Sequence, residues 1–135
     1  MWGSFLAAAG VALGAYSAHG LEKALIALSY EDSLEQRMEW FRTGVSYHLY
    51  HALGIMLAGL IAEHRGYSRL LRIAPWGMLV GIVLFSGSLY AMSLAGNNWR
   101  FLGAIVPLGG LSFIAGWIAL AIGSIQGSEV KSKFN

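Results

Sequence analysis

Histidines inside uncharged segments are the residues of this sequence best placed to do chemistry. His19 lies near the end of residues 1–21 and His51 near the middle of residues 43–62, two segments without Asp, Glu, Lys or Arg. Two imidazoles from different helices could ligate a haem iron, and a histidine pair with water could bind a metal ion. Hydrogen bonding of each ring to a carbonyl or serine of a neighbouring helix is the favoured alternative. No cofactor is therefore predicted, and a haem or quinone site stays as the competing hypothesis.

Two further polar residues stand close to His51 in the sequence. Tyr47 precedes it by about one helical turn, and His48 lies three positions before it, about 60° away around a helix. An HxxH pair without a third ligand is a weak metal motif, so we predict no metal site. The candidate polar site in the membrane consists of His19, His51, Tyr47 and His48.

Patterns that would indicate catalysis are missing from the sequence. The Ser86-Gly87-Ser88 run lacks the G-x-S-x-G motif, and Gly109-Gly110 lacks the lysine of a phosphate-binding loop. There is no cysteine, and the uncharged segments carry no carboxylate of the kind that proton-coupled transporters place in the membrane. We therefore predict no catalytic residue, and an enzymatic function is not favoured.

The segments that must position these residues are long enough to cross a membrane. Only 12% of the 135 residues are charged, about half the usual share in a soluble domain. Residues 1–21, 43–62, 73–99 and 101–128 contain no Asp, Glu, Lys or Arg, and each meets the length criterion for a transmembrane helix. We predict an all-α polytopic membrane protein, a single domain over 1–135 that forms a compact four-transmembrane-helix bundle. The spans are expected at about residues 2–20, 43–63, 74–95 and 101–123.

The polar connection between the first two spans predicts two local features. Leu21 and Leu25 share one helical face, which predicts a short amphipathic helix lying along the membrane surface. Ser29 followed by Asp32 resembles the capping box that begins a helix. The second long helix is therefore expected to start near residue 30, well before the membrane.

Small residues and two prolines predict how the spans pack and bend. Small residues recur on one face of every span, which predicts close approach of the helix backbones. Pro75 is expected in the first turn of the third helix, whereas Pro107 is expected to kink the fourth. The packing glycines are Gly10, Gly14, Gly44, Gly54, Gly77, Gly81, Gly109 and Gly116.

The distribution of basic residues bears on orientation and partners. With the N-terminus inside, the inner connections and tail hold one more Lys or Arg than the outer ones, which favours both termini in the cytoplasm. No dense basic run is present, so nucleic acid is not expected as a partner. The expected partners are the lipid bilayer and other membrane subunits, or a second copy of the chain.

Four segments of the sequence resemble a known membrane family. They are ALGAYSAHGL, FRTGVSYHLYHALG, FSGSLYAMSLAG and LGAIVPLGGLSFIAGW, in this order and covering all four spans. The chain is similar to the family called domain of unknown function 423, or the transmembrane protein 256 family. This resemblance implies a four-span protein of the bacterial inner membrane and implies no activity. Within the motif, His51 is the anchoring position, and His48 is less characteristic.

Three functions are compatible with these observations. The favoured one is a non-catalytic structural or accessory subunit that packs through glycine-rich helix faces against itself or a larger membrane complex. A binding protein for haem, quinone or lipid centred on His51 and His19 is the first alternative, and a small transporter is the second. A bound haem would show a Soret band, which separates the first two hypotheses.

Overall fold

The computed structural model describes residues 2–132 as helices joined by short connections, with side chains described through residue 126. No strand occurs in this part of the chain. The all-α polytopic membrane class predicted from the sequence is confirmed. The elements are α1 (Trp2–His19), α2 (Leu21–Ala27), η1 (Glu31–Ser33), α3 (Leu34–Arg65), α4 (Arg69–Gly81), the π-helix η2 (Ile82–Gly87), α5 (Ser88–Leu94), the 3₁₀ helix η3 (Asn97–Ala104) and α6 (Val106–Ser132).

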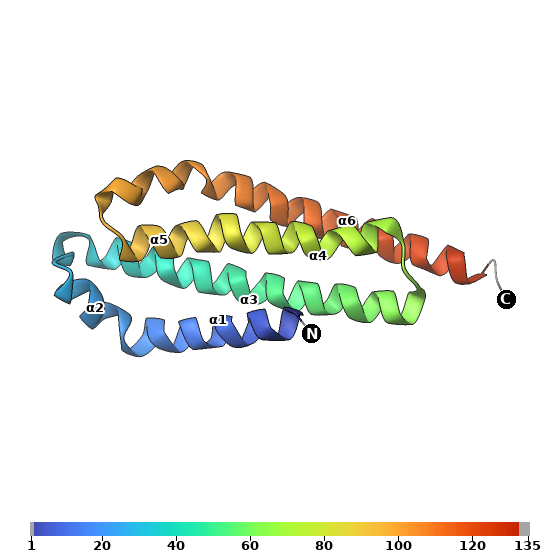
Figure 1. The fold of residues 1–135 in the computed structure, drawn as a ribbon, viewed down its shortest axis with the longest axis horizontal. Helices are drawn as coiled ribbons and strands as arrows, with labels where there is room; N and C mark the ends of the chain where they lie inside the picture. The colour runs from blue at the N-terminus through green and yellow to red at the C-terminus, as the bar shows by residue number, and fades with distance from the viewer. Residues whose placement is uncertain (1, 133–135) are drawn as a thin grey trace.

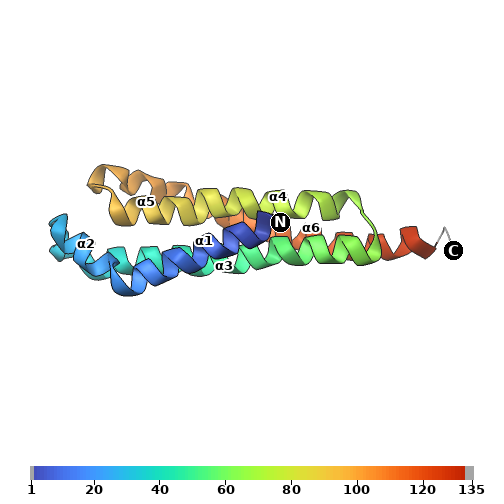
Figure 2. The ribbon, with the colours of Figure 1, turned by 60° about the horizontal axis from the view of Figure 1, so that its bottom comes forward.

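The long helices run roughly antiparallel along one axis (Figures 1 and 2). α3, the continuous α4–η2–α5 rod and α6 pack against one another and form the centre of the molecule. α1 packs against α3 and α2 and makes at most marginal contact with any other element. α1 is therefore a peripheral helix, attached along one side of α3 (Figure 1).

Three helical stretches of the described chain are long and apolar enough to cross a membrane, namely Glu31–Arg65, Arg69–Leu94 and Asn97–Gln126. The pair formed by α1 and α2 passes the same test together, although a bend of 62° separates the two helices. α2 turns its buried residues Leu21 and Leu25 toward Phe41 of α3. The bend therefore brings an apolar face of α2 onto the start of α3.

The interpretation of Ser29 as a helix N-cap is wrong. Ser29 has a φ of 59° and follows the end of α2. The Tyr30 amide donates to the Leu25 carbonyl at 3.1 Å and the Ser29 amide to the Ile26 carbonyl at 2.9 Å, which is the hydrogen-bond pattern of a Schellman C-cap. Ser29 thus ends α2, and α3 begins at Leu34 after the short helix η1.

Both prolines differ from their predicted positions within the helices. Pro75 lies inside α4, because Ser68 caps this helix by accepting a hydrogen bond from the Leu71 amide at 3.2 Å. Pro107 lies in the first turn of α6, where its missing N–H removes no helical hydrogen bond. The chain before it forms the 3₁₀ helix η3, so the irregularity of this span precedes the proline.

Close backbone contacts join the central helices. A Cβ atom added to Gly77 would lie 3.1 Å from the Cα atom of Gly116, and one added to Gly109 would lie 2.5 Å from the amide nitrogen of Phe85. Ser112 adds a hydrogen bond from its hydroxyl to the Gly77 carbonyl at 2.9 Å. The remaining glycines of the sequence prediction, each of which also faces a neighbouring helix, are Gly10, Gly14, Gly44, Gly54 and Gly81.

Candidate functional site

His51 is buried between α3 and α6, with 5% of its surface exposed. Its Nδ1 lies 2.6 Å from the carbonyl oxygen of Tyr47, one turn earlier in α3. Because a carbonyl only accepts, Nδ1 carries the proton and donates it. The ring stacks on Phe113 of α6 with ring centroids 3.4 Å apart, and Trp117 approaches it edge-on. Tyr47 extends this aromatic cluster by packing against Phe85.

The structure does not bring His19 to His51. His19 ends α1 and is exposed, whereas His51 faces α6, which α1 does not contact appreciably. The part of α1 that packs beside this stretch of α3 is the turn around Gly10. A Cβ atom added to Gly10 would contact the side chains of Leu49 and His48. His19 lies nine residues further on, about 14 Å along the helix axis. The geometry therefore offers no pair of axial ligands from these two residues.

His48 forms a second buried polar group, on the side of α3 that faces α1 and α5. Its Nδ1 lies 3.4 Å from the hydroxyl of Tyr90. Among the side chains that the structure describes, Ser86 Oγ is buried without a hydrogen-bond partner, and His48 Nε2 makes no hydrogen bond of standard geometry although the Leu6 backbone of α1 lies near the His48 ring. Ser86 belongs to the π-helix η2, one turn before Tyr90. His48 and His51 thus face different helices and do not act together.

Arg37 is an extensively hydrogen-bonded side chain in the described part of the chain, and it is only 1% exposed. Its Nη1 donates to the carbonyls of Met92, Ser93 and Ala95 at 3.0, 2.8 and 2.8 Å. Its Nη2 donates to Asn97 Oδ1 at 3.0 Å and its Nε to Ser33 Oγ at 2.9 Å. The guanidinium therefore satisfies carbonyl groups that the end of α5 leaves without helical partners.

Arg37 is held without a carboxylate partner in the described part of the structure. The carbonyl end of a helix carries partial negative charge, so the end of α5 stabilises the guanidinium. The ring of Tyr30 lies 3.7 Å from the guanidinium carbon and adds a cation–π contact. In return, the Ser93 hydroxyl donates to the Arg37 carbonyl at 2.8 Å. Arg37 thereby joins α3, η1 and the α5–η3 connection at one end of the bundle.

The sequence analysis missed Arg37, although the sequence contains a sign of it. Arg37, Phe41 and Val45 are spaced by four residues, and the last two are buried core residues. A charged residue on the apolar stripe of a helix indicates a buried, paired charge. This spacing could have identified Arg37 before the structure was known.

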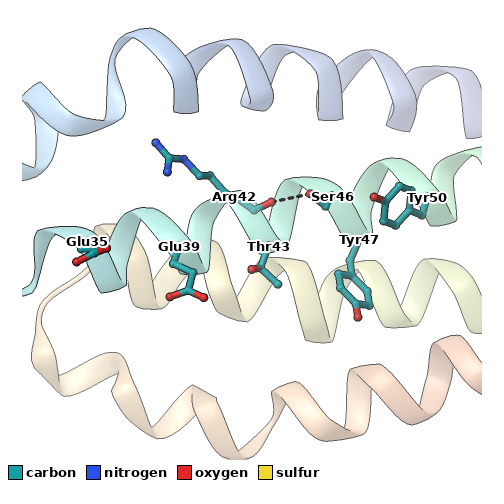
Figure 3. Close-up of a pocket in the computed structure, with 7 residues that line it drawn as sticks. All are labelled: Glu35, Glu39, Arg42, Thr43, Ser46, Tyr47 and Tyr50. Atoms are coloured by element: carbon teal, nitrogen blue, oxygen red, sulfur yellow. Dashed lines mark hydrogen bonds between the residues drawn. The ribbon is translucent and has the colours of Figure 1, made fainter.

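A groove with charged and hydroxyl-bearing side chains follows the outward face of α3. It has a volume of about 430 Å³ and extends from the beginning of α3 into the uncharged part of the helix. A second groove of about 440 Å³ adjoins it between α1 and α3 and shares Arg42 and Ser46 with it. Figure 3 shows the residues that line the first groove, Glu35, Glu39, Arg42, Thr43, Ser46, Tyr47 and Tyr50.

Metal-ligating side chains are not gathered around the histidines or in these grooves within the described part of the chain. The described residues contain no group of three or more His, Asp or Glu side chains that could hold a metal ion. The arrangement at His51 is suited to hydrogen bonding and aromatic packing between helices. The open groove presents carboxylate, guanidinium and hydroxyl groups at the surface of α3.

Comparison with known proteins identifies the family of the chain. The model of the family "Protein of unknown function (DUF423)" matches residues 13–110. The chain is 39% identical over 124 residues to the UPF0382 membrane protein YwdK of Bacillus subtilis, with 92% of this chain and 93% of the relative covered. It is 38% identical over 117 residues to the UPF0382 inner membrane protein YgdD of Escherichia coli K12, with 86% of this chain and 80% of the relative covered. No solved structure matches the chain significantly.

These matches confirm the resemblance seen in the four sequence segments and the membrane character of the chain. Neither the family description nor the names of these relatives assign an activity. The chain therefore belongs to the DUF423 family, a family of multi-pass membrane proteins of unknown function.

Proposed function

We propose that the protein is a non-catalytic membrane subunit whose peripheral helix α1 packs against a transmembrane helix of another subunit. The observation that carries this proposal is the one-sided packing of α1. Its buried residues Gly3, Gly10 and Ser17 face α3, and the opposite side has no neighbour in the described chain. The middle of that opposite side carries small exposed residues at helical spacing, Ser4, Ala8, Ala12 and Ala15, and the exposed side chains of Phe5 and Val11 flank them.

The composition of this face differs from that of a lipid-facing helix in the same molecule. The exposed side of α6 carries Leu111, Ile114, Ile118 and Ile122, as expected for contact with acyl chains. Small residues instead allow two helix backbones to approach closely, which is the main source of attraction between helices in lipid. The glycines of α4 and α6 are already used within the chain, so α1 supplies the free surface for a partner.

Bulky substitutions on this face test the proposal. The double variant Ala8→Leu/Ala12→Leu should abolish oligomers or co-purifying subunits in mild detergent, measured by light scattering and mass spectrometry. Ala115→Leu, at an exposed alanine of α6, is the matched control and should leave the assembly unchanged. A wild-type protein that is strictly monomeric and free of other proteins in native membranes would contradict the proposal.

We also propose that both termini lie in the cytoplasm of a bacterial cell, with the protein in the inner membrane. The bias in basic residues supports this orientation, and the E. coli relative is named an inner membrane protein. In whole cells, Asn98→Cys should react with a membrane-impermeant thiol reagent and Tyr67→Cys should not. The reverse labelling pattern would invert the topology.

A further inference from the structure

The groove on α3 carries charges of both signs that have no partner of opposite charge in the described part of the chain. Glu35 and Glu39 lie one turn apart, and Arg42 follows Glu39 by three residues, about 4.5 Å along the helix axis. All three side chains are exposed, and none forms an ion pair within the described part of the chain. Figure 3 shows Arg42 pointing toward one side of this face of α3 and Glu39 toward the other. Residues three apart on a helix have Cβ atoms about 5–6 Å apart, so the two exposed side chains can both turn toward a ligand that lies between them.

The groove crosses the boundary between the polar and apolar parts of α3. Its charged residues precede residue 43, where the uncharged run of the helix begins. Beyond this point it is lined by Tyr47 and Tyr50, and Tyr50 is 61% exposed. Tyrosine side chains at such positions lie at the level of lipid headgroups. A ligand of this groove therefore has a charged end at the headgroup level and an apolar end that enters the membrane.

We propose that this groove binds a phospholipid whose headgroup carries a primary ammonium group, of the phosphatidylethanolamine class. Such a headgroup places an ammonium two carbons away from a phosphate, so its charges complement those of the groove. The guanidinium of Arg42 binds the phosphate, with the hydroxyl of Ser17 in the adjoining groove beside it. The carboxylates of Glu35 and Glu39 accept hydrogen bonds from the ammonium, and the acyl chains follow Tyr47 and Tyr50 into the membrane.

The two carboxylates determine which phospholipid fits. A lipid with a quaternary ammonium has no N–H to donate to Glu35 or Glu39, although its phosphate still meets Arg42. An anionic lipid without an ammonium meets the guanidinium but is repelled by both carboxylates. Free phosphate would bind Arg42 without any preference set by the two acids. The order of preference among lipids therefore reports on the complete site.

Competition among lipids measures this preference directly. The purified protein is equilibrated in mixed micelles with equal amounts of dioleoyl phosphatidylethanolamine, phosphatidylcholine and phosphatidylglycerol, and bound lipids are counted by native mass spectrometry. Because the charges are exposed, we expect a preference for phosphatidylethanolamine of about three- to fivefold over phosphatidylcholine. Equal binding of all three lipids by the wild type would overturn the proposal.

Variants separate the two halves of the site. Glu35→Gln/Glu39→Gln should abolish the preference for phosphatidylethanolamine over phosphatidylcholine while total lipid binding is retained. Arg42→Gln should reduce binding of all three lipids, and Arg42→Lys should restore part of it. Arg72→Gln, at an exposed arginine near the opposite end of the bundle, is the matched control and should keep the wild-type ratios.

Two results would refute the lipid as the occupant. One is a double glutamate variant that folds, as judged by circular dichroism, and keeps the wild-type lipid ratios. The other is a second copy of the chain seated on the groove, detected as a cross-linked Ser46→Cys dimer in membranes at a yield above that of Ala115→Cys. The proposal does not depend on the partner of α1, because that partner is expected on the opposite side of α1 from α3.

Discussion

Replacing Arg37 by methionine is the perturbation with the largest expected effect on stability. Methionine keeps an unbranched apolar chain in place of the arginine stem and removes the guanidinium. It thereby removes five hydrogen bonds, three of them to carbonyls at the end of α5. The Tyr30 ring also loses its cation.

The expected magnitude follows from the burial of these partners. A buried acceptor left without a donor costs about 1–3 kcal/mol, and breaking a buried charged network costs about 3–5 kcal/mol in total. Because this end of the bundle lies close to water, some carbonyls will be hydrated in the variant. We therefore expect Arg37→Met to lower the free energy of unfolding by about 3 kcal/mol, and Arg37→Lys by about 1–2 kcal/mol, since one ammonium cannot reach all five acceptors.

The assay is reversible unfolding in mixed micelles with increasing denaturing detergent, followed by tryptophan fluorescence and circular dichroism. Arg72→Met, at an exposed site, is the control and should change the free energy of unfolding by less than about 0.5 kcal/mol. If Arg37→Met unfolds within this same margin of the wild type, the guanidinium does not hold the end of α5 and the argument fails.

Three further predictions concern single positions. Ser29→Gly should stabilise the protein by up to about 1 kcal/mol, because glycine adopts the left-handed conformation at φ 59° without a steric penalty from a Cβ atom. A lower midpoint of thermal unfolding in this variant would contradict the assignment of Ser29 to the C-terminal cap of α2. Gly109→Ala should destabilise the protein by about 1–3 kcal/mol, because the new Cβ atom would contact the Phe85 backbone. Gly59→Ala is the control and should be neutral or stabilising, since a Cβ atom there has no neighbour within 4 Å. Equal unfolding midpoints for the two variants would refute the contact. His51→Ala should cost about 1–3 kcal/mol, with partial recovery in His51→Gln, and an unchanged midpoint for His51→Ala would show that the buried ring contributes nothing.

The elements of the fold were predictable because lipid imposes a simple requirement on sequence. A segment that crosses the membrane must be uncharged for about 20 residues, so the uncharged runs could be read directly as helices. The burial of His51 was predictable for a related reason, since lipid offers an imidazole no hydrogen-bond partner. The stacking of its ring on Phe113 was not, because it depends on which helices become neighbours.

The connections were harder to predict because several residue patterns fit more than one role there. Ser29 and Asp32 have the spacing of a capping box, but the hydrogen bonds of Tyr30 and Ser29 to the end of α2 decide the local structure. Pro75 is found inside a helix because Ser68 starts α4 seven residues earlier. Arg37 was overlooked because its acceptors lie 55 to 60 residues later in the sequence, apart from Ser33.

This separation between Arg37 and its acceptors also constrains how the protein is made. When α3 leaves the ribosome, the carbonyls of Met92, Ser93 and Ala95 have not been synthesised. At roughly 5–20 residues per second, the missing 55 to 60 residues require about 3–12 s. During this interval the guanidinium must remain hydrated or be held by the insertion machinery, so this end of the bundle is completed only after α5 and the chain as far as Asn97 have been synthesised.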